Sequence, residues 1–153
     1  VNVLYCLQIP RRDGKTLGGT EFANMRMAYE ALPEEMKTRL ADAVVVHNFE
    51  KMWEYMRTVR KSGRAPMSDE QRRQRPPVEH PLFLTHPITG RKVLYANPGY
   101  AERILGMSEQ ESDDTIAWLV EHQLQERFRH TFTWTEGDLL VWDNFGTLHR
   151  GIA

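Results

Sequence analysis

Six histidines are the residues of this sequence best suited to metal or acid–base chemistry. His149 differs from the others because it follows the apolar run Leu139–Trp142 and the turn Asp143–Gly146, which would return it toward a sheet on a rigid mount. A polar side chain held rigidly near a core is what a metal ligand requires. The residue alone leaves two interpretations open, a metal ligand and a packed structural histidine.

The other five histidines favour structural roles. His80 and His86 each precede a proline, which restricts their backbones to extended conformations and indicates that they shape loops. The remaining three lie in predicted helices or strands without polar partners nearby in sequence, and they are His47, His122 and His130.

Motifs of several other chemistries fail or are absent. Gly14-Lys15-Thr16 looks like the end of a phosphate-binding loop, but Ile9 stands where the leading glycine belongs. The sequence contains no G-x-G-x-x-G, C-x-x-C, H-E-x-x-H or G-x-S-x-G. Common dinucleotide, zinc and serine-hydrolase signatures are therefore excluded.

Elements that would position these residues can be read from the hydrophobic pattern and the turn residues. The first half predicts a strand at 1–7, a helix at 25–32 capped by Asn24, a helix that begins at Pro33 and buries Met36, Leu40 and Ala43, and a strand at 44–46. The second half predicts a hairpin of 83–85 and 92–95, a short helix at 97–106, a helix from Ser108 to about Leu124, a half-buried strand at 127–134 and a fully buried strand at 139–142. Strands at both ends with helices between them predict a β-rich α+β fold.

Residues 50–79 interrupt this pattern with a long polar stretch that contains prolines and many basic residues. Such a stretch is uncommon in a compact domain unless it is functional, so we interpret it as a long loop or a lid. Asp69 and Glu70 interleave with its arginines, which favours a solvated surface over an anion site.

Composition narrows the class of protein. A length of 153 residues predicts a single domain. A net charge of −1 gives no overall electrostatic attraction to nucleic acid or to an anionic membrane, so we expect neither as a partner. Its single cysteine and the lack of a long apolar run predict a cytoplasmic location. Both ends are apolar and the first residue is not methionine, so we expect the single domain at 1–153 to be truncated at both ends. Whether the protein forms a homo-oligomer stays open.

Three strings together carry a resemblance to a known family. They are Gly18–Met25 followed by Ala28–Leu32, Thr85–Pro87 with Gly90–Lys92 and Leu94–Asn97, and Trp142–Asn144 with His149-Arg150. In this order and spacing, they resemble the taurine dioxygenase (TauD/TfdA) family of α-ketoglutarate-dependent non-haem Fe(II) dioxygenases, across essentially the whole chain.

The resemblance implies a double-stranded β-helix (jelly roll) with flanking helices, and Fe(II), α-ketoglutarate and O2 as reactants. His149 matches the distal iron-ligand histidine of the family and is its catalytic candidate here. Thr20 matches the threonine whose hydroxyl binds the far carboxylate of α-ketoglutarate; without the resemblance it reads as a turn hydroxyl after Gly18-Gly19. Trp142 and Asp143 are expected to shape the turn. Residues 50–79 fall where the family carries a lid over its substrate, and their basic residues would face an anionic substrate.

Two parts of the family pattern are missing from the sequence. No histidine is followed two residues later by Asp or Glu, so the H-x-D/E pair that supplies the other iron ligands lies outside the chain or is absent. In the family, the arginine that binds the keto acid comes about one strand after the distal histidine, and the sequence ends before that position. Arg150 directly follows His149 and does not match it. Three interpretations follow. The first is a dioxygenase that oxidises a small anionic organic substrate of sulfonate, sulfate ester or aryloxyalkanoate type. The second is a non-catalytic jelly-roll domain for binding or assembly, and the third is a decayed product that does not fold alone.

Overall fold

The computed structural model describes residues 1–152. Backbone contacts divide the chain into two compact units. Unit 1 contains Val1–Leu32, Thr85–Leu94 and the chain from His122 onward, and unit 2 contains Pro33–Leu84 and Tyr95–Glu121. Strands and helices mix in both units, which confirms the expected strand-rich α/β class at this level, while the jelly-roll topology and the single domain stay predictions. In the described part of the chain, no helix is long and apolar enough to cross a bilayer.

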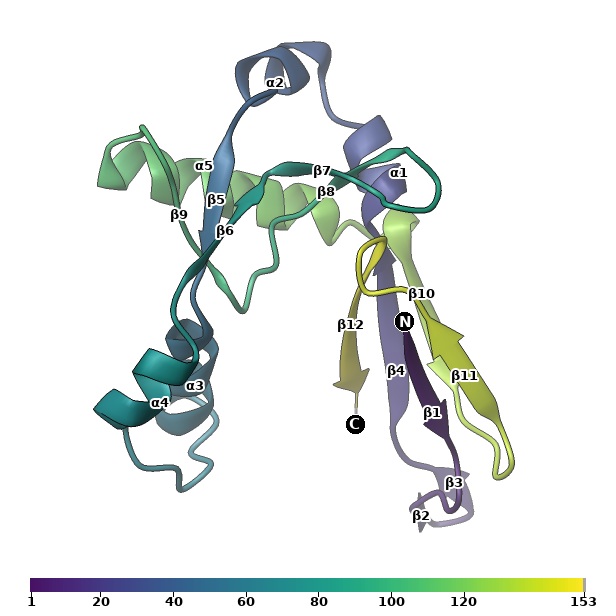
Figure 1. Cartoon of the computed structure of the whole chain (residues 1–153). Coiled ribbons are helices and arrows are strands. Elements are labelled where there is room, and N and C mark those ends of the chain that lie inside the picture. The colour runs from purple at the N-terminus through teal and green to yellow at the C-terminus, as the bar shows by residue number, and fades with distance from the viewer. Residues whose placement is uncertain (153) are drawn as a thin grey trace. The chain divides into compact units, whose positions relative to one another are not determined.

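A three-stranded antiparallel sheet organises unit 1. Its order is β10 (Arg129–Thr133), β4 (Gly19–Asn24) and β12 (Thr147–Ile152), so β4 is the central strand (Figure 1). Phe22 on β4 lies opposite His130 on β10 and opposite His149 on β12. Directly opposite residues of an antiparallel pair share a face, so these three side chains lie on one face of the sheet.

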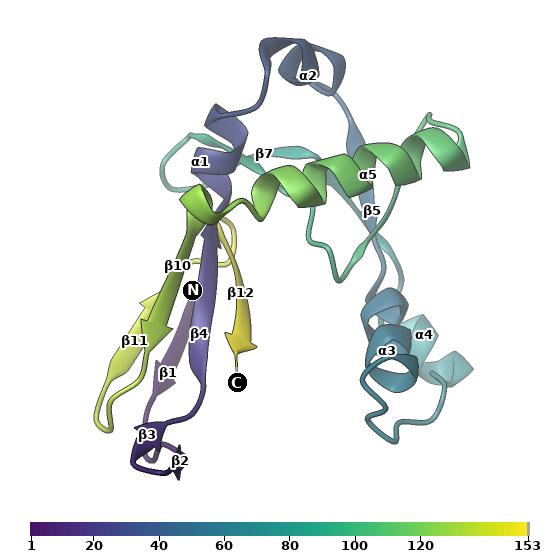
Figure 2. The same ribbon diagram turned by 180° about the vertical axis from the view of Figure 1, so that it is seen from behind.

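The two-stranded sheet of β1 (Asn2–Tyr5) and β11 (Leu139–Trp142) corrects one prediction (Figure 2). We expected a fully buried strand at 139–142, but Leu139 and Val141 are 62% and 54% exposed. Within residues 1–152, β11 pairs with no strand other than β1. Successive side chains point to opposite faces, so one set of its side chains faces outward. The smaller hairpin of β2 (Arg11–Arg12) and β3 (Lys15–Thr16) turns at Asp13 and Gly14, which both have positive φ.

Helix α1 (Met25–Glu30) begins where the sequence predicts. Asn24 caps it, because its side chain accepts a hydrogen bond from the Met27 N–H at 3.0 Å. The imidazole Nε2 of buried His122 lies 2.8 Å from the Ala28 carbonyl, so this nitrogen carries the proton and donates it. The predicted structural role of His122 is thereby confirmed. A short 3-10 helix, η1 (Glu126–Phe128), leads from there into β10.

The turn between β11 and β12 is held by Asp143. Its carboxylate accepts hydrogen bonds from the Phe145 N–H at 3.0 Å and from the Gly146 N–H at 2.7 Å. It also accepts from His86, whose Nε2 lies 2.8 Å from Asp143 Oδ2. Burial acts to raise the pKa of Asp143, but the hydrogen bonds from Phe145, His86 and Gly146 outweigh it and leave the pKa below its ordinary value.

His86 follows β7 (Phe83–Thr85) in the hairpin with β8 (Lys92–Leu94), as the sequence predicts. Its Nδ1 accepts hydrogen bonds from the N–H groups of Ile88 and Thr89, at 3.2 Å each. An imidazole nitrogen that accepts carries no proton, so the proton lies on Nε2, and this N–H donates a hydrogen bond to Asp143. His86 therefore shapes its own loop, as predicted, and fastens that loop to the turn before β12.

Unit 2 contains the antiparallel sheet β6 (Val78–Pro81), β5 (Val44–His47) and β9 (Ala101–Ile104). The predicted helix at 97–106 is wrong. Ala101 and Ile104 are fully buried on β9, which pairs with β5, and the Asn97 side chain accepts from the Gly99 N–H in a turn instead of capping a helix. The predicted helix after Ser108 is confirmed as α5 (Glu109–Gln123). Helix α2 (Glu34–Arg39) follows Pro33, with Leu40 fully buried at its end and Met36 and Ala43 only half-buried.

Residues 50–79 contain two helices where we expected a loop, namely α3 (Phe49–Thr58) and α4 (Asp69–Gln74). Charge pairs one turn apart support them: Arg57 with Glu54, and Arg73 with Glu70. Arg72 joins the two helices through Glu50 at 2.8 Å. Arg57, Arg72 and Arg73 thus pair with carboxylates within the segment. Its role as a lid stays a prediction.

Three rings pack together beside β5. The centroids of His47, His80 and Tyr95 lie 5.1 to 5.3 Å apart, and His47 Nε2 is buried without a hydrogen-bond partner. Burial, followed by the neighbouring His80, lowers the pKa of His47 to about 4. His47 is therefore a packed neutral histidine at physiological pH.

We predict that Asp143→Asn lowers the free energy of unfolding by about 1–3 kcal/mol at pH 7. The amide NH2 group would replace one carboxylate oxygen, and it would face an N–H donor from which it cannot accept a hydrogen bond. The contribution of an ionised Asp143 is complete above the unfolded pKa and is lost as the pH falls through the lower folded pKa. Urea unfolding should therefore separate variant from wild type clearly at pH 7 and less at pH 3. Asp42→Asn, at an exposed carboxylate, is the control. Equal stability of variant and wild type at pH 7 would contradict the role of this carboxylate.

We also predict that His47 makes the fold sensitive to mild acid. The unfolded state binds a proton near pH 6.5, whereas folded His47 resists it down to about pH 4, so stability is full above 6.5 and falls between these values. His47→Phe keeps a ring and should reduce this loss by an amount on the order of a few kcal/mol. Urea unfolding at pH 7.0, 5.5 and 4.5 measures it, with exposed His130→Phe as the control. An unchanged pH slope in His47→Phe would refute the assignment.

Candidate active site

Thr20 and His149 lie on the same face of the β10–β4–β12 sheet. Thr20 is opposite Gly151 on β12, and His149 is opposite Phe22, two residues along β4. Residues in this diagonal relation lie about 7–8 Å apart, within reach of a small molecule that contacts both side chains. The two residues that the sequence singled out are therefore brought together, although 129 positions separate them in the chain.

His149 is an exposed residue flanked by aromatic rings. The Trp142 ring meets its imidazole edge-on at a centroid distance of 5.1 Å, and the Phe22 ring lies at 6.2 Å. Within the described residues, no hydrogen bond occupies its ring nitrogens, so both are available to a ligand. The rings fix its position without using its polar atoms.

The mount of His149 is rigid, as the sequence predicts. The Asp143 carboxylate holds the preceding turn, and the Gly146 carbonyl accepts from the Met25 N–H at 2.9 Å, where α1 begins. A Cβ on Gly146 would lie 2.6 Å from Asp143 Oδ2, so only glycine permits this close approach. The expectation that Asp143 shapes the turn is confirmed.

Thr20 is nearly buried, with 9% of its surface exposed. The indole Nε1 of Trp134 lies 3.0 Å from Thr20 Oγ1 and donates a hydrogen bond to it. Trp134 also lines an apolar pocket of about 500 Å³ together with Gly18, Gly19 and residues 4–10. Sequence analysis missed the contact between Trp134 and Thr20, and its only signal was the position of Trp134 at the end of the alternating strand.

The opposite face of the sheet carries an ion-pair cluster. Glu21 accepts from Arg129 at 3.0 Å and lies 2.8 Å from Arg150. Residues next to each other on a strand point to opposite faces, so Arg150 is directed away from the face of His149 and Thr20. This agrees with the sequence argument that Arg150 is not the keto-acid arginine.

The residues described here do not form a metal centre by themselves. Among residues 1–152, no three His, Cys, Asp or Glu side chains come together as a cluster that could hold a metal ion. A single neutral imidazole is an insufficient donor set for Fe(II), which prefers two histidines and a carboxylate. His149 can serve iron only alongside ligands from elsewhere.

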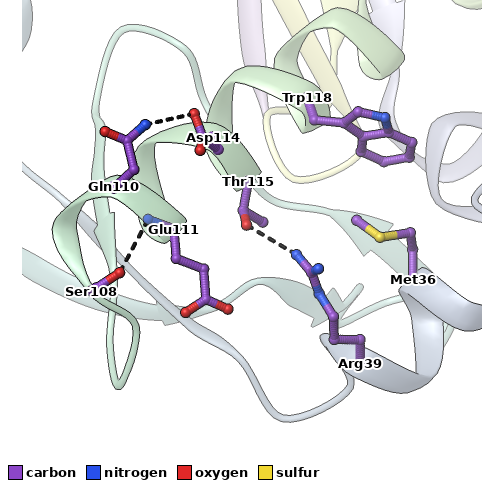
Figure 3. Close-up of a pocket in the computed structure, with 8 residues that line it drawn as sticks. All are labelled: Met36, Arg39, Ser108, Gln110, Glu111, Asp114, Thr115 and Trp118. Atoms are coloured by element: carbon purple, nitrogen blue, oxygen red, sulfur yellow. Dashed lines mark hydrogen bonds between the residues drawn. The ribbon is translucent and has the colours of Figure 1, made fainter.

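A second pocket, of about 530 Å³, lies in unit 2 between α2 and α5 (Figure 3). Arg39 reaches from α2 to donate a hydrogen bond to Thr115 Oγ1 at 3.0 Å, while Glu111 and Asp114 add carboxylates and Met36 and Trp118 add apolar surface. Neither candidate site residue, Thr20 or His149, lines this pocket. Its guanidinium already has a partner, so the pocket offers no clear chemistry.

Comparisons with known proteins find the same family over most of the chain. The model of the family described as "Taurine catabolism dioxygenase TauD, TfdA family" matches residues 1–153. An α-ketoglutarate-dependent 2,4-dichlorophenoxyacetate dioxygenase of Cupriavidus pinatubonensis (strain JMP 134 / LMG 1197) is 37% identical over 135 residues, which cover 88% of this chain and 44% of that protein.

Two solved structures are also similar. A protein from Burkholderia xenovorans, described as an α-ketoglutarate-dependent 2,4-D dioxygenase, has a TM-score of 0.83 and 32% identity over 97% of this chain and 54% of its own. AAD-2 in complex with Mn(II) and N-oxalylglycine has a TM-score of 0.80 and 34% identity over 99% of this chain and 55% of its own. The chain thus spans about half the length of the relatives it matches. By the family match along its whole length, this chain belongs to the TauD/TfdA family.

Proposed function

We propose that the protein is an α-ketoglutarate- and Fe(II)-dependent dioxygenase that uses O2 to oxidise a small anionic organic substrate and releases succinate and CO2. The observation that carries this proposal is the placement of Thr20 and His149 on one face of one sheet, in a chain of the TauD/TfdA family. Similarity to the AAD-2 complex with Mn(II) and N-oxalylglycine supports a metal and a keto acid as its reactants. TM-scores of 0.83 and 0.80 support a double-stranded β-helix as the fold of the whole protein.

In this proposal His149 contributes one imidazole nitrogen to the iron, which supplies the activation of oxygen. The remaining ligands, an H-x-D/E pair, would come from outside these 153 residues, as would the arginine for the keto acid. Thr20 donates its hydroxyl proton to the far carboxylate of α-ketoglutarate. Its low exposure suits this role, because a hydrogen bond to a carboxylate is stronger where water is excluded.

The substrate class rests on the names of relatives. The family is described by taurine, a sulfonate, and the relative from Cupriavidus by an aryloxyacetate. An alkylsulfatase of Acinetobacter baylyi, 31% identical over 157 residues, is named for a sulfate ester. We therefore propose a sulfonate, sulfate ester or aryloxyalkanoate as the substrate. We also propose that the protein is cytoplasmic.

The α3–α4 segment, residues 50–79, is proposed as the lid over this substrate. Two of its arginines face rings instead of carboxylates: the Arg64 guanidinium lies 5.0 Å from the Trp53 centroid, and that of Arg75 lies 4.5 Å from the Phe49 centroid. Neither guanidinium is paired with a carboxylate among the described ion pairs, so both are available to an anion. We predict that Arg64→Glu and Arg75→Glu each raise KM for an anionic substrate at least severalfold, through charge repulsion, while Arg73→Glu on the same segment does less. Steady-state kinetics at low salt measure this, and unchanged KM values would remove the proposed contact.

We predict that His149→Ala abolishes succinate formation by the whole protein with Fe(II), ascorbate, α-ketoglutarate and a panel of sulfonates, alkylsulfates and aryloxyacetates. His130→Ala is a matched control, because His130 faces the same Phe22 from the other side of β4 and is also exposed. It should keep activity within about threefold of wild type, as expected for a surface substitution. Calorimetry with Mn(II) should show weakened metal binding in His149→Ala only. If the folded wild type neither binds metal nor consumes the keto acid, the non-catalytic binding domain is the correct interpretation.

A further inference from the structure

We propose that Trp134 is a positioning residue that orients the Thr20 hydroxyl toward the carboxylate of the keto acid. This inference rests on the proposed function, and it adds a residue that the sequence did not single out. It starts from one contact, the hydrogen bond from Trp134 Nε1 to Thr20 Oγ1 at 3.0 Å.

The direction of this hydrogen bond is fixed by chemistry. An indole N–H can only donate, whereas a hydroxyl donates one proton and accepts through two lone pairs. Thr20 Oγ1 is therefore the acceptor, and its own proton must point away from Trp134. A carboxylate can only accept, so it is the complementary partner for that proton. Accepting one hydrogen bond also polarises the hydroxyl and makes it a stronger donor.

Trp134 is itself held by the sheet that carries Thr20. Its ring packs edge-on against Phe132 at a centroid distance of 5.0 Å, and Phe132 lies directly opposite Thr20 in the β10–β4 pair. The strands approach closely next to this point, since a Cβ on Gly19 would lie 3.0 Å from the Phe132 carbonyl oxygen. The Trp134 N–H and the Thr20 hydroxyl are therefore both held by the closely packed β10–β4 pair.

There is also space for a ligand beside the pair. The pocket of about 500 Å³ reaches Trp134 and Gly19, which are the hydrogen-bond partner and the chain neighbour of Thr20. The lining of this pocket is mainly apolar, and Thr20 itself is not among the lining residues. The pocket therefore shows space next to the Trp134–Thr20 pair, while the hydrogen bond itself carries the inference.

A double-mutant cycle in the whole protein tests the inference. Thr20→Val removes the hydroxyl, and Trp134→Phe removes the N–H while it keeps an aromatic ring. The readout is calorimetric binding of N-oxalylglycine, an unreactive dicarboxylate analogue of α-ketoglutarate, to the Mn(II)-loaded protein. We expect Trp134→Phe to weaken binding about three- to tenfold, the size of one neutral hydrogen bond, with Mn(II) affinity unchanged. In the Thr20→Val background, the same substitution should change binding less than twofold, because its effect passes through the hydroxyl.

The outcomes separate the two proposals. If Thr20→Val binds the analogue as tightly as wild type, the role of Thr20 in the proposed function is wrong. If Thr20→Val weakens binding but Trp134→Phe does not, only the role of Trp134 is overturned. Equal losses from Trp134→Phe in both backgrounds indicate general packing and also overturn it. Trp118→Phe, at a tryptophan on α5 that lines the other pocket, is the matched control and should leave the affinity for the analogue unchanged.

Discussion

The carboxylate of Asp143 ties together the parts of unit 1 on which the candidate site depends. It accepts from two backbone N–H groups of its own turn and from His86, a residue 57 positions earlier in the chain. The tautomer of His86 is set by two further N–H groups that donate to its other nitrogen. One side chain thus fixes the end of β11, the start of β12 and the loop after β7. His149 lies three residues beyond this anchored turn, and its position follows from it.

The sheet then gives its two candidate residues different surroundings. Thr20 lies on the central strand and is nearly buried, while His149 lies on β12 and is exposed beside two aromatic rings. A nearly buried hydroxyl favours a directed hydrogen bond, and an exposed imidazole with unused nitrogens suits a ligand that needs further donors from outside. The proposed function assigns the keto acid to Thr20 and the metal to His149. It leaves the opposite face to the ion pairs of Glu21.

Local signals in the sequence predicted elements well where they are strong and failed where pairing decides. The Asn24 cap and the helix after Ser108 are correct, because each depends on hydrogen bonds between residues three apart. The pattern at Asn97-Pro98 predicts a helix start, because the signals for a turn and for an N-cap are nearly the same. Pairing with β5 makes the following residues a strand instead. The charges of residues 50–79 suggested a loop, but their spacing supports two short helices.

The candidate residues Thr20 and His149, the family resemblance and the turn before β12 can be predicted without a structure, because each depends on a contiguous string of residues. That the two residues share a face follows from strand register, which places Phe22 opposite His149; a shift of one residue would move His149 to the other face. The contacts of Trp134 with Thr20 and of His86 with Asp143 also follow from the fold, because they join residues 114 and 57 positions apart. Such contacts depend on how distant strands pair, and no local pattern of residues encodes that pairing.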